Sequence, residues 1–259
     1  MSKLPISVFI IAKNEADRIP LAIKSVRDWV DEVIVVDSGS QDDTVAVSEA
    51  LGARVLHRAW TGYGEQKVYG ESQCRNDWLL NIDADEEIAP GLRDEILALF
   101  AAGAPAAAYR LPILPLYSFQ ARAHPWTAHH HPVRLYRKSH AGFSTSPVHD
   151  TVQVRDGRVG RLKGMVLHRS FRSLTHHVDK VNFYSSAQAE DRHAKGRNPS
   201  ALELLFTPPL AFLKSLIGRR EFVNGIDGVI VSYMYAFQRF IRLAKTRERF
   251  QAARRDERR

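Results

Sequence analysis

The sequence predicts an α/β protein with a mostly parallel sheet that carries helices on both faces. Two observations support this fold class. Apolar runs of strand length alternate with segments of helical periodicity, and these runs lack the alternation of apolar and polar residues that a sheet with one solvent-exposed face would show. We expect residues 1–174 to form this α/β domain. Residues 175–259 are basic and have apolar residues at helical spacing, and we expect them to form a helical C-terminal extension.

The expected elements alternate regularly along the first part of the chain. Apolar runs predict strands at residues 6–12, 32–37, 54–57 and 78–82, and helical spacing or capping signals predict helices at residues 16–29, 44–51, 62–74 and 90–100. In such a fold, side chains just beyond the carboxyl ends of the strands meet at one edge of the sheet, where ligands bind. Asn14, Glu15, Asp37, Asp83 and Asp85 fall at those ends.

The strand predicted at residues 78–82 runs directly into four carboxylates, Asp83, Asp85, Glu86 and Glu87. In an extended chain Asp83 and Asp85 would project to the same side and could hold Mg²⁺ or Mn²⁺, which would clamp a diphosphate. Alternatively, residues 85–87 supply negative charge to the first turn of the helix that follows. That alternative leaves Asp83 unexplained.

Charge is unevenly distributed along the chain. Residues 1–100 carry ten Lys or Arg against eighteen Asp or Glu, residues 101–194 carry thirteen against five, and residues 195–259 carry fourteen against six. An acidic, metal-binding part thus precedes a part suited to anions such as phosphorylated sugars, lipid headgroups or a membrane surface. No nucleic-acid-binding motif is present, so we expect no nucleic-acid partner.

The cellular location is expected to be the cytoplasm. The single cysteine, Cys74, suits a reducing compartment, and the first residues lack the apolar segment of a signal peptide. We also expect no segment long and apolar enough to span a bilayer.

Three N-terminal stretches resemble a known family. Ser7-Val-Phe-Ile-Ile-Ala-Lys-Asn-Glu15, Val35-Val-Asp-Ser-Gly-Ser-Gln-Asp42 and Leu80-Asn-Ile-Asp-Ala-Asp-Glu-Glu87 look like the signatures of inverting family 2 glycosyltransferases with the GT-A (Rossmann-like) fold. A narrower resemblance points to the bacterial β-1,4-glucosyltransferase branch that builds the lipopolysaccharide core. It rests on the stretches Trp60–Lys67, Arg134–Tyr136, Pro147–Asp150 and Leu167–Phe171.

The resemblance implies roles for individual residues. Asp37 would accept a hydrogen bond from the base or ribose of a nucleotide diphosphate sugar, Lys67 would lie near the base or diphosphate, and Asp83 would contact the ribose or the metal. Asp85 would ligate Mg²⁺ or Mn²⁺, which stabilises a departing nucleoside diphosphate. Alternatively, Asp37 is a cap for its own loop and Lys67 is a solvated helix residue. Val68 departs from the family, which often has asparagine there.

The basic part of the chain supplies the remaining candidates. Asp150 is the predicted catalytic base that deprotonates the acceptor hydroxyl, with His149 beside it orienting acceptor or metal. The alternative is that Asp150 only begins a turn. His168 is a candidate third metal ligand or, alternatively, a core histidine, and Arg134 is a candidate substrate-binding residue.

Four histidines lie close together at residues 124–131. Adjacent histidines cannot easily share one ion, so we interpret this segment as a loop that lines an acceptor cleft.

Beyond residue 175, apolar segments are bordered by arginines. Residues 202–217, interrupted by Pro208-Pro209, and residues 229–243 are typical of helices that lie in the membrane interface beside anionic lipid. A homodimer interface is the alternative. Residues 251–259 are expected to form a frayed basic tail.

These features together predict a cytoplasmic enzyme attached peripherally to the inner face of the cell membrane. It would transfer a hexose, with UDP-glucose as the expected donor, to a lipid-linked glycan of the lipopolysaccharide core or a related glycolipid. The rival enzyme is a sugar-phosphate nucleotidyltransferase, but the glycine-rich and basic loop that it needs after the first strand is replaced by residues 13–16. The rival outside enzymology is a membrane- or glycan-binding module with a lapsed site.

Overall fold

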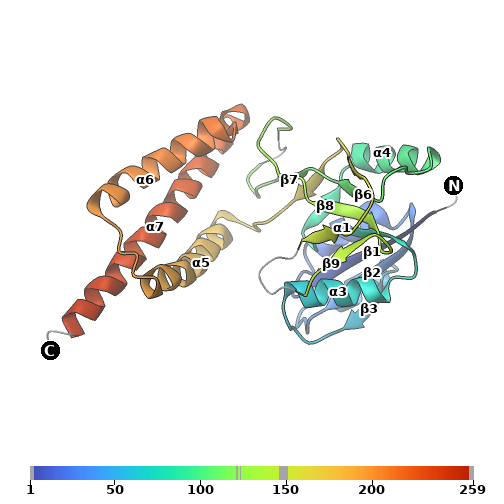
Figure 1. Ribbon diagram of the computed structural model, residues 1–259, viewed down its shortest axis with the longest axis horizontal. Coiled ribbons are helices and arrows are strands. Elements are labelled where there is room, and N and C mark those ends of the chain that lie inside the picture. The colour runs from blue at the N-terminus through green and yellow to red at the C-terminus, as the bar shows by residue number, and fades with distance from the viewer. Residues whose placement is uncertain (1–2, 121, 123, 146–150, 257–259) are drawn as a thin grey trace. The chain divides into compact units, whose positions relative to one another are not determined.

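The computed structural model describes residues 3–120, 122, 124–145 and 151–256. The chain forms two compact units (Figure 1). Unit 1 comprises Met1–Pro115 and His129–Arg169, and unit 2 comprises Leu116–Ala128 and Ser170–Arg259. The division near residue 170 lies close to the boundary expected from sequence, but the segment 116–128 joins the helical unit.

Unit 1 is built on a seven-stranded sheet in the order β11-β6-β8-β4-β1-β2-β3. Its strands are β1 (Leu4–Ala12), β2 (Val30–Asp37), β3 (Arg54–His57), β4 (Trp78–Asn81), β6 (Ala108–Arg110), β8 (Val133–Arg137) and β11 (Val159–Arg161). The pairs β1–β2, β1–β4, β2–β3 and β6–β11 are parallel, whereas β8 runs antiparallel to both of its neighbours. The sheet is therefore mixed and mostly parallel.

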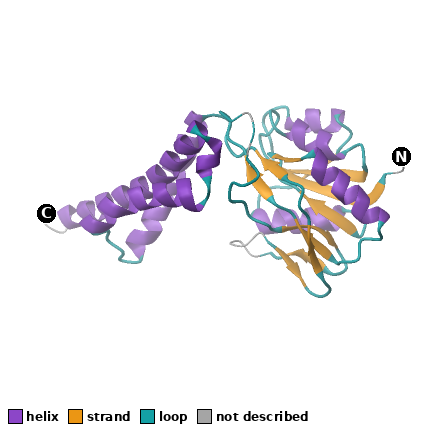
Figure 2. Ribbon diagram, turned by 90° about the horizontal axis from the view of Figure 1, so that it is seen from above, coloured by secondary structure: helices purple, strands orange, loops and turns teal. Residues whose placement is uncertain are grey.

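Helices cover both faces of this sheet (Figure 2). They are α1 (Ile19–Val26), α2 (Thr44–Ala50), α3 (Tyr63–Gln73) and α4 (Pro90–Ala101). Along β1, Val8 and Ile10 pack into a core shared with α1 and α4, while Phe9 points into a second core shared with Cys74 and Tyr136. Burial on both faces explains why the strands read as continuous apolar runs. The predicted α/β fold class is confirmed.

The order of the strands creates a switch point at β1. The chain moves outward through β2 and β3, then returns so that β4 pairs with the other side of β1. In sheets of this kind a crevice forms beyond the carboxyl ends of the strands at such a point. The residues that follow β1 and β4 therefore occupy the expected ligand-binding edge.

Two smaller sheets complete unit 1. One pairs β5 (Glu86–Ile88), β12 (Val166–His168) and β7 (Ile113–Pro115), and the other pairs β9 (Ala141–Phe143) with β10 (Val152–Val154). Since Glu86 and Glu87 belong to strand β5, they do not lie in the first turn of α4. The alternative interpretation of these carboxylates as helix-terminal charges is wrong for these two residues.

Unit 2 is mainly helical, with α5 (Leu174–Ala194), α6 (Ala201–Leu213), the short turns η1 (Lys214–Gly218) and η2 (Glu221–Asn224), and α7 (Ile226–Asp256). Ser173 and Ser200 cap α5 and α6, each accepting a hydrogen bond from the backbone N–H three residues later. The expectation of a frayed tail from residue 251 is wrong for the described residues, because α7 continues to Asp256.

The α6 segment also corrects a second expectation. Pro208 and Pro209 lie inside the helix and do not end it, although each lacks the N–H that a helix interior uses. As a result, Ala201–Gly218 is one helical segment of 18 residues with a mean hydropathy of 1.3. Only 11% of this segment is buried. It is long and apolar enough to cross a membrane by length and composition, so the expectation that no such segment exists is wrong.

Candidate active site

The first part of the site is the turn that follows β2. Asp37 is 3% exposed, and one of its carboxylate oxygens accepts hydrogen bonds from the backbone N–H groups of Gly39 and Ser40, at 2.8 and 3.0 Å. The Ser40 hydroxyl donates to the other oxygen. Asp37 therefore caps its own turn, as the alternative interpretation expected, and its predicted contact with a nucleotide stays a prediction.

Asn14 joins the ends of β1 and β2. Its backbone N–H donates to the Ser40 hydroxyl at 2.9 Å, and its side-chain Oδ1 accepts from the Gln41 backbone N–H at 2.8 Å. Asn14 has a φ of 56°, a left-handed conformation that asparagine tolerates better than most residues. The two strand ends are thereby held together as the sequence predicted.

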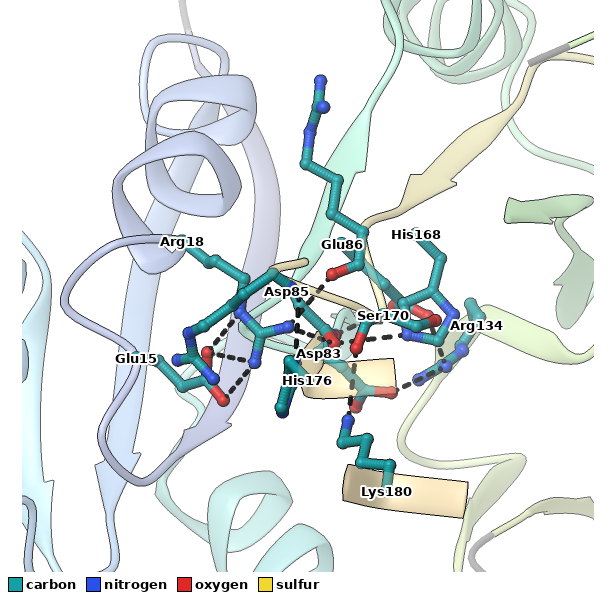
Figure 3. A network of polar contacts seen from close by, with 12 residues as sticks. Glu15, Arg18, Asp83, Asp85, Glu86, Arg134, His168, Ser170, His176 and Lys180 are labelled. Atoms are coloured by element: carbon teal, nitrogen blue, oxygen red, sulfur yellow. Dashed lines mark hydrogen bonds and ion pairs between the residues drawn. The ribbon is translucent and has the colours of Figure 1, made fainter. Parts of the chain in front are cut away.

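The second part of the site is a cluster of opposite charges around Asp83 (Figure 3). The two carboxylate oxygens of Asp83 contact Lys67 Nζ at 3.1 Å and Arg134 Nη2 at 3.2 Å. Arg134 Nη2 also lies 3.0 Å from Glu86 Oε1, and Glu86 Oε2 accepts the Asp83 backbone N–H at 2.9 Å. Lys67 is only 2% exposed, so the interpretation of Lys67 as a solvated helix residue is wrong.

The third part of the site is a cluster around Asp85 (Figure 3). Arg18 forms two hydrogen bonds to Glu15, of 2.6 and 2.7 Å, and also contacts Asp85 Oδ2 at 3.3 Å. His168 Nε2 lies 3.4 Å from the same Asp85 oxygen. The pairing of β12 with β5 places His168 opposite Glu86, which explains how a residue 83 positions later in the chain reaches this edge.

Burial and charge act against each other at these groups. Burial alone would raise the pKa of Asp83, but the charges of Lys67 and Arg134 outweigh it and hold that pKa well below its usual range. Burial raises the pKa of Glu86 even though Arg134 lies against it. Burial disfavours the charged form of His168, yet its hydrogen bond to Asp85 raises its pKa.

Asp83 and Asp85 do not lie on an extended chain. Strand β4 ends at Asn81, and the chain turns at Ala84 and Asp85, with the Glu86 backbone N–H bonded to the Asp83 carbonyl at 2.9 Å. The expectation that strand alternation points both carboxylates to the same side is therefore wrong. They face different cations, and the described residues contain no group of three or more His, Cys, Asp or Glu side chains arranged to hold a metal ion.

Other predicted residues lie elsewhere or outside the description. Asp150 and His149 fall within residues 146–150, which lie outside the described residues, so the base assignment stays a prediction. His130 forms a bridge to Ile113, and burial followed by the charge of Arg134 lowers its pKa. The histidine-rich segment is divided between the two units, and its role at an acceptor stays a prediction.

The sequence interpretation missed the parts played by Arg18 and Glu86. Arg18 is 8% exposed and connects Glu15 to Asp85, and Glu86 is 2% exposed and braces Arg134. From the sequence, only the Glu15–Arg18 contact could have been expected, because these two residues are three positions apart. The other contacts join residues that are far apart in the chain.

The chain is similar in sequence to known proteins along most of its length. The model of the family "Glycosyl transferase family 2" matches residues 7–151. An uncharacterized glycosyltransferase from Rickettsia felis is 44% identical over 253 residues, which cover 94% of this chain and 89% of that protein. The lipopolysaccharide core biosynthesis glycosyltransferase LpsC from Rhizobium meliloti is 30% identical over 254 residues, covering 95% and 93%.

Among solved structures, the match to glucosyl-3-phosphoglycerate synthase from Mycobacterium tuberculosis, crystallised with Mn²⁺ and UDP-glucose, has a TM-score of 0.34. It is 29% identical and covers 43% of each chain. The family match spans more than half of this chain, and the relatives align along nearly all of it. The chain therefore belongs to glycosyl transferase family 2 and is a glycosyltransferase.

Proposed function

We propose that this glycosyltransferase moves glucose from UDP-glucose, with inversion and with the help of a divalent cation, to a lipopolysaccharide-core or related cell-surface glycolipid. The observation that carries the proposal is the pair of carboxylates Asp83 and Asp85 at the switch point of the sheet, where several cations surround them. The name of the LpsC relative supports the acceptor class.

Asp85 and His168 are the residues that fit a divalent cation best. The Asp85 Oδ2 and His168 Nε2 atoms are 3.4 Å apart, a separation that allows one cation to contact both. The sequence also proposed Asp83 as a ligand, but its carboxylate faces Lys67 and Arg134, so diphosphate oxygens would complete the set around Asp85 and His168. When bound, Mg²⁺ or Mn²⁺ would neutralise the charge that develops on the departing diphosphate.

The surrounding cations would hold the donor's diphosphate. Arg18, Lys67 and Arg134 already lie 3.0 to 3.3 Å from carboxylate oxygens of residues 83, 85 and 86. A polyanion that enters beside them would compete with Asp83 and Asp85 for their N–H donors. Because these positive charges are already held at this edge, they would need little reorganisation to stabilise a departing diphosphate.

Asn14, Glu15 and Asp37 would bind the nucleoside. Their backbone and side-chain hydrogen bonds fix the loops after β1 and β2 beside the switch point. A rigid loop of this kind is suited to positioning a base and ribose, because little conformational freedom is lost on binding.

Proton removal is assigned to Asp150, from the sequence alone. Direct displacement at the anomeric carbon requires that the acceptor hydroxyl lose its proton on the face opposite the leaving group. One carboxylate is sufficient because the donor is already activated. His149 is proposed to orient the acceptor or the metal.

Unit 2 is proposed to attach the enzyme to the inner face of the cell membrane, where a lipid-linked acceptor is available. Leu205, Phe206 and Leu210 on α6 are 64%, 53% and 62% exposed, which is unusual for large apolar side chains of a soluble surface. The alternative occupant of this face is a second copy of the chain.

Release of UDP by the purified full-length chain tests the proposed reaction. The assay contains UDP-glucose, Mn²⁺ and a lipopolysaccharide-core acceptor, and NMR of the product gives the anomeric configuration. We expect activity that is lost in EDTA, restored by Mn²⁺ or Mg²⁺, and lost in Asp85→Asn and Asp150→Asn.

Different outcomes remove different parts of the proposal. Full activity in EDTA would exclude the metal role, full activity of Asp150→Asn would exclude the base, and a retained anomeric configuration would exclude inversion.

A further inference from the structure

A basic hollow lies between α6 and α7 within unit 2. It has a volume of about 320 Å³ and is lined by Thr207, Leu210, Ala211, Lys214, Tyr235, Arg239 and Arg242. The lining residues lie at positions 207, 210 and 211 of α6, at position 214 of η1 and at positions 235, 239 and 242 of α7, so each side of the hollow is one helical face. We call this hollow the α6–α7 groove.

Positive charge is concentrated around Tyr235 in the groove. Arg239 donates a hydrogen bond to the Tyr235 hydroxyl at 3.0 Å, and the guanidinium carbons of Arg219 and Arg239 lie 4.4 and 4.9 Å from the centre of its ring. Burial would raise the pKa of Tyr235, but the hydrogen bond from Arg239 and the nearby cations, including Lys214, lower it.

The positive charge of the groove is not balanced by an acid among its lining residues. The nearby Glu203 accepts two contacts from Arg192, at 3.0 and 3.2 Å, and so is already engaged. Arg242 Nε is buried without a hydrogen-bond partner among the described residues, and burial followed by the charge of Arg239 lowers the pKa of Arg242. An anion in the groove would therefore offset positive charge that no lining residue neutralises.

An apolar surface adjoins the groove. Leu210 lines it and is 62% exposed, and further apolar side chains continue along α6 on both sides of Leu210. The exposed members of this strip are Leu202, Leu205, Phe206, Leu210 and Leu213 on α6 and Ile217 on η1. An anionic group with attached apolar chains matches both surfaces at once, whereas a soluble anion matches only the groove.

We propose that the α6–α7 groove binds the phosphate of an anionic membrane phospholipid, with Lys214, Arg239 and Arg242 as donors and the acyl chains beside the apolar strip of α6. This inference rests on the proposed membrane attachment and goes beyond it. It assigns a specific lipid-binding site, whereas the attachment alone requires only a general attraction between unit 2 and the membrane. Charge complementarity selects the phosphate, and the adjoining strip selects a lipid over free phosphate.

Vesicle sedimentation with the full-length chain tests the site. Vesicles of phosphatidylcholine alone are compared with vesicles that contain one fifth phosphatidylglycerol, at 0.15 M salt. The groove variant is Arg239→Gln/Arg242→Gln, and the matched control is Arg254→Gln/Arg255→Gln, which removes the same charge from exposed positions of the same helix. Twelve residues of helix separate Arg242 from Arg254, about 18 Å, which exceeds a screening length of about 8 Å.

The groove variant should lose about 25-fold or more in affinity for the anionic vesicles, counting about fivefold for each cation. The control should lose less than about threefold under the same screening. Lys214→Gln, at an exposed position, should lose about fivefold without disturbing helix packing, and circular dichroism checks that each variant is folded.

The outcomes separate the groove from the wider proposal. Equal losses in the groove variant and the control would overturn the groove but keep membrane attachment. Failure of the wild-type chain to bind any vesicle would overturn both, while UDP release from a soluble acceptor would still test the proposed reaction. Thermal stabilisation of the wild-type chain by millimolar glycerol 3-phosphate as large as that by anionic vesicles would also overturn the lipid assignment. So would a wild-type dimer that becomes a monomer in the groove variant.

Discussion

Asp83→Asn and Asp85→Asn should have different effects on stability although both should abolish transfer. Both substitutions remove a charge and keep nearly the same shape. Asp83 lies between Lys67 and Arg134, which are 2% and 9% exposed. Asp85 contacts Arg18, which already has two hydrogen bonds to Glu15.

The contact distances give the size of the difference. A charge pair at 3.1 or 3.2 Å, the separations of Asp83 from Lys67 and Arg134, attracts by about 5 kcal/mol at an effective dielectric constant of about 20. The cost of burying the three charges offsets most of this, and the Asp83 side chain is 31% exposed, which weakens the pair further. We expect Asp83→Asn to lower the free energy of unfolding by about 2–3 kcal/mol.

Asp85→Asn should cost less than about 1 kcal/mol. Its contacts with Arg18 and His168 are longer, at 3.3 and 3.4 Å, and Glu15 still holds Arg18 after the substitution.

Urea unfolding in EDTA measures both effects without a contribution from bound metal, and the UDP-release assay is run on the same preparations. Equal destabilisation by the two substitutions would refute the assignment of separate cation partners. A fully active Asp85→Asn enzyme would instead refute its role at the diphosphate.

Three further predictions concern other parts of the fold. Burial, followed by the charge of Lys180, lowers the pKa of His177 from 6.5 to about 4. Unit 2 should therefore keep its full stability above about pH 6.5 and lose at most about 3 kcal/mol as the pH falls toward 4. Unfolding followed by circular dichroism should show that His177→Gln removes this loss, and an unchanged pH profile would contradict it. Gly164→Ala should cost about 2 kcal/mol or more, because the added Cβ would lie 2.3 Å from Leu92 Cα. The control Gly91→Ala, where nothing lies within 4 Å of the added atom, should be neutral or slightly stabilising in thermal unfolding; similar melting temperatures for the two variants would argue against the clash. Ser200→Ala removes the cap of α6 and should cost about 1 kcal/mol in the same measurement, whereas an unchanged melting temperature would show that the cap contributes nothing.

Local pattern was sufficient for the order of the elements in unit 1. The run from Ile6 to Ala12 is apolar at every position except Ser7, and this distinguishes a strand covered on both faces from one with a solvent-exposed face. The placement of Asn14, Asp37 and Asp83 at one edge followed from the same pattern, because parallel strands bring their carboxyl ends together. Fold class and the approximate position of the site were therefore predictable without coordinates.

The direction of each side chain in the site depended on contacts between distant parts of the chain. Asp83 faces Arg134 because β8 pairs with β4, and Asp85 faces His168 because β12 pairs with β5. A turn at Ala84 and Asp85 also replaced the extended chain on which the sequence argument relied. Antiparallel partners and turns of this kind leave no periodic signal in the residues that they connect.

The amino-acid sequence by itself determined which residues carry charge, which runs are buried, and at which edge of the sheet the acids gather, since these depend on local periodicity. Only the tertiary structure decided which cation each acid meets and that α6 continues through Pro208 and Pro209. It also decided that Arg239 and Arg242 line one groove with Lys214. The acid–cation contacts depend on strands that pair although they are far apart in the chain, and the groove depends on the approach of α6 and α7.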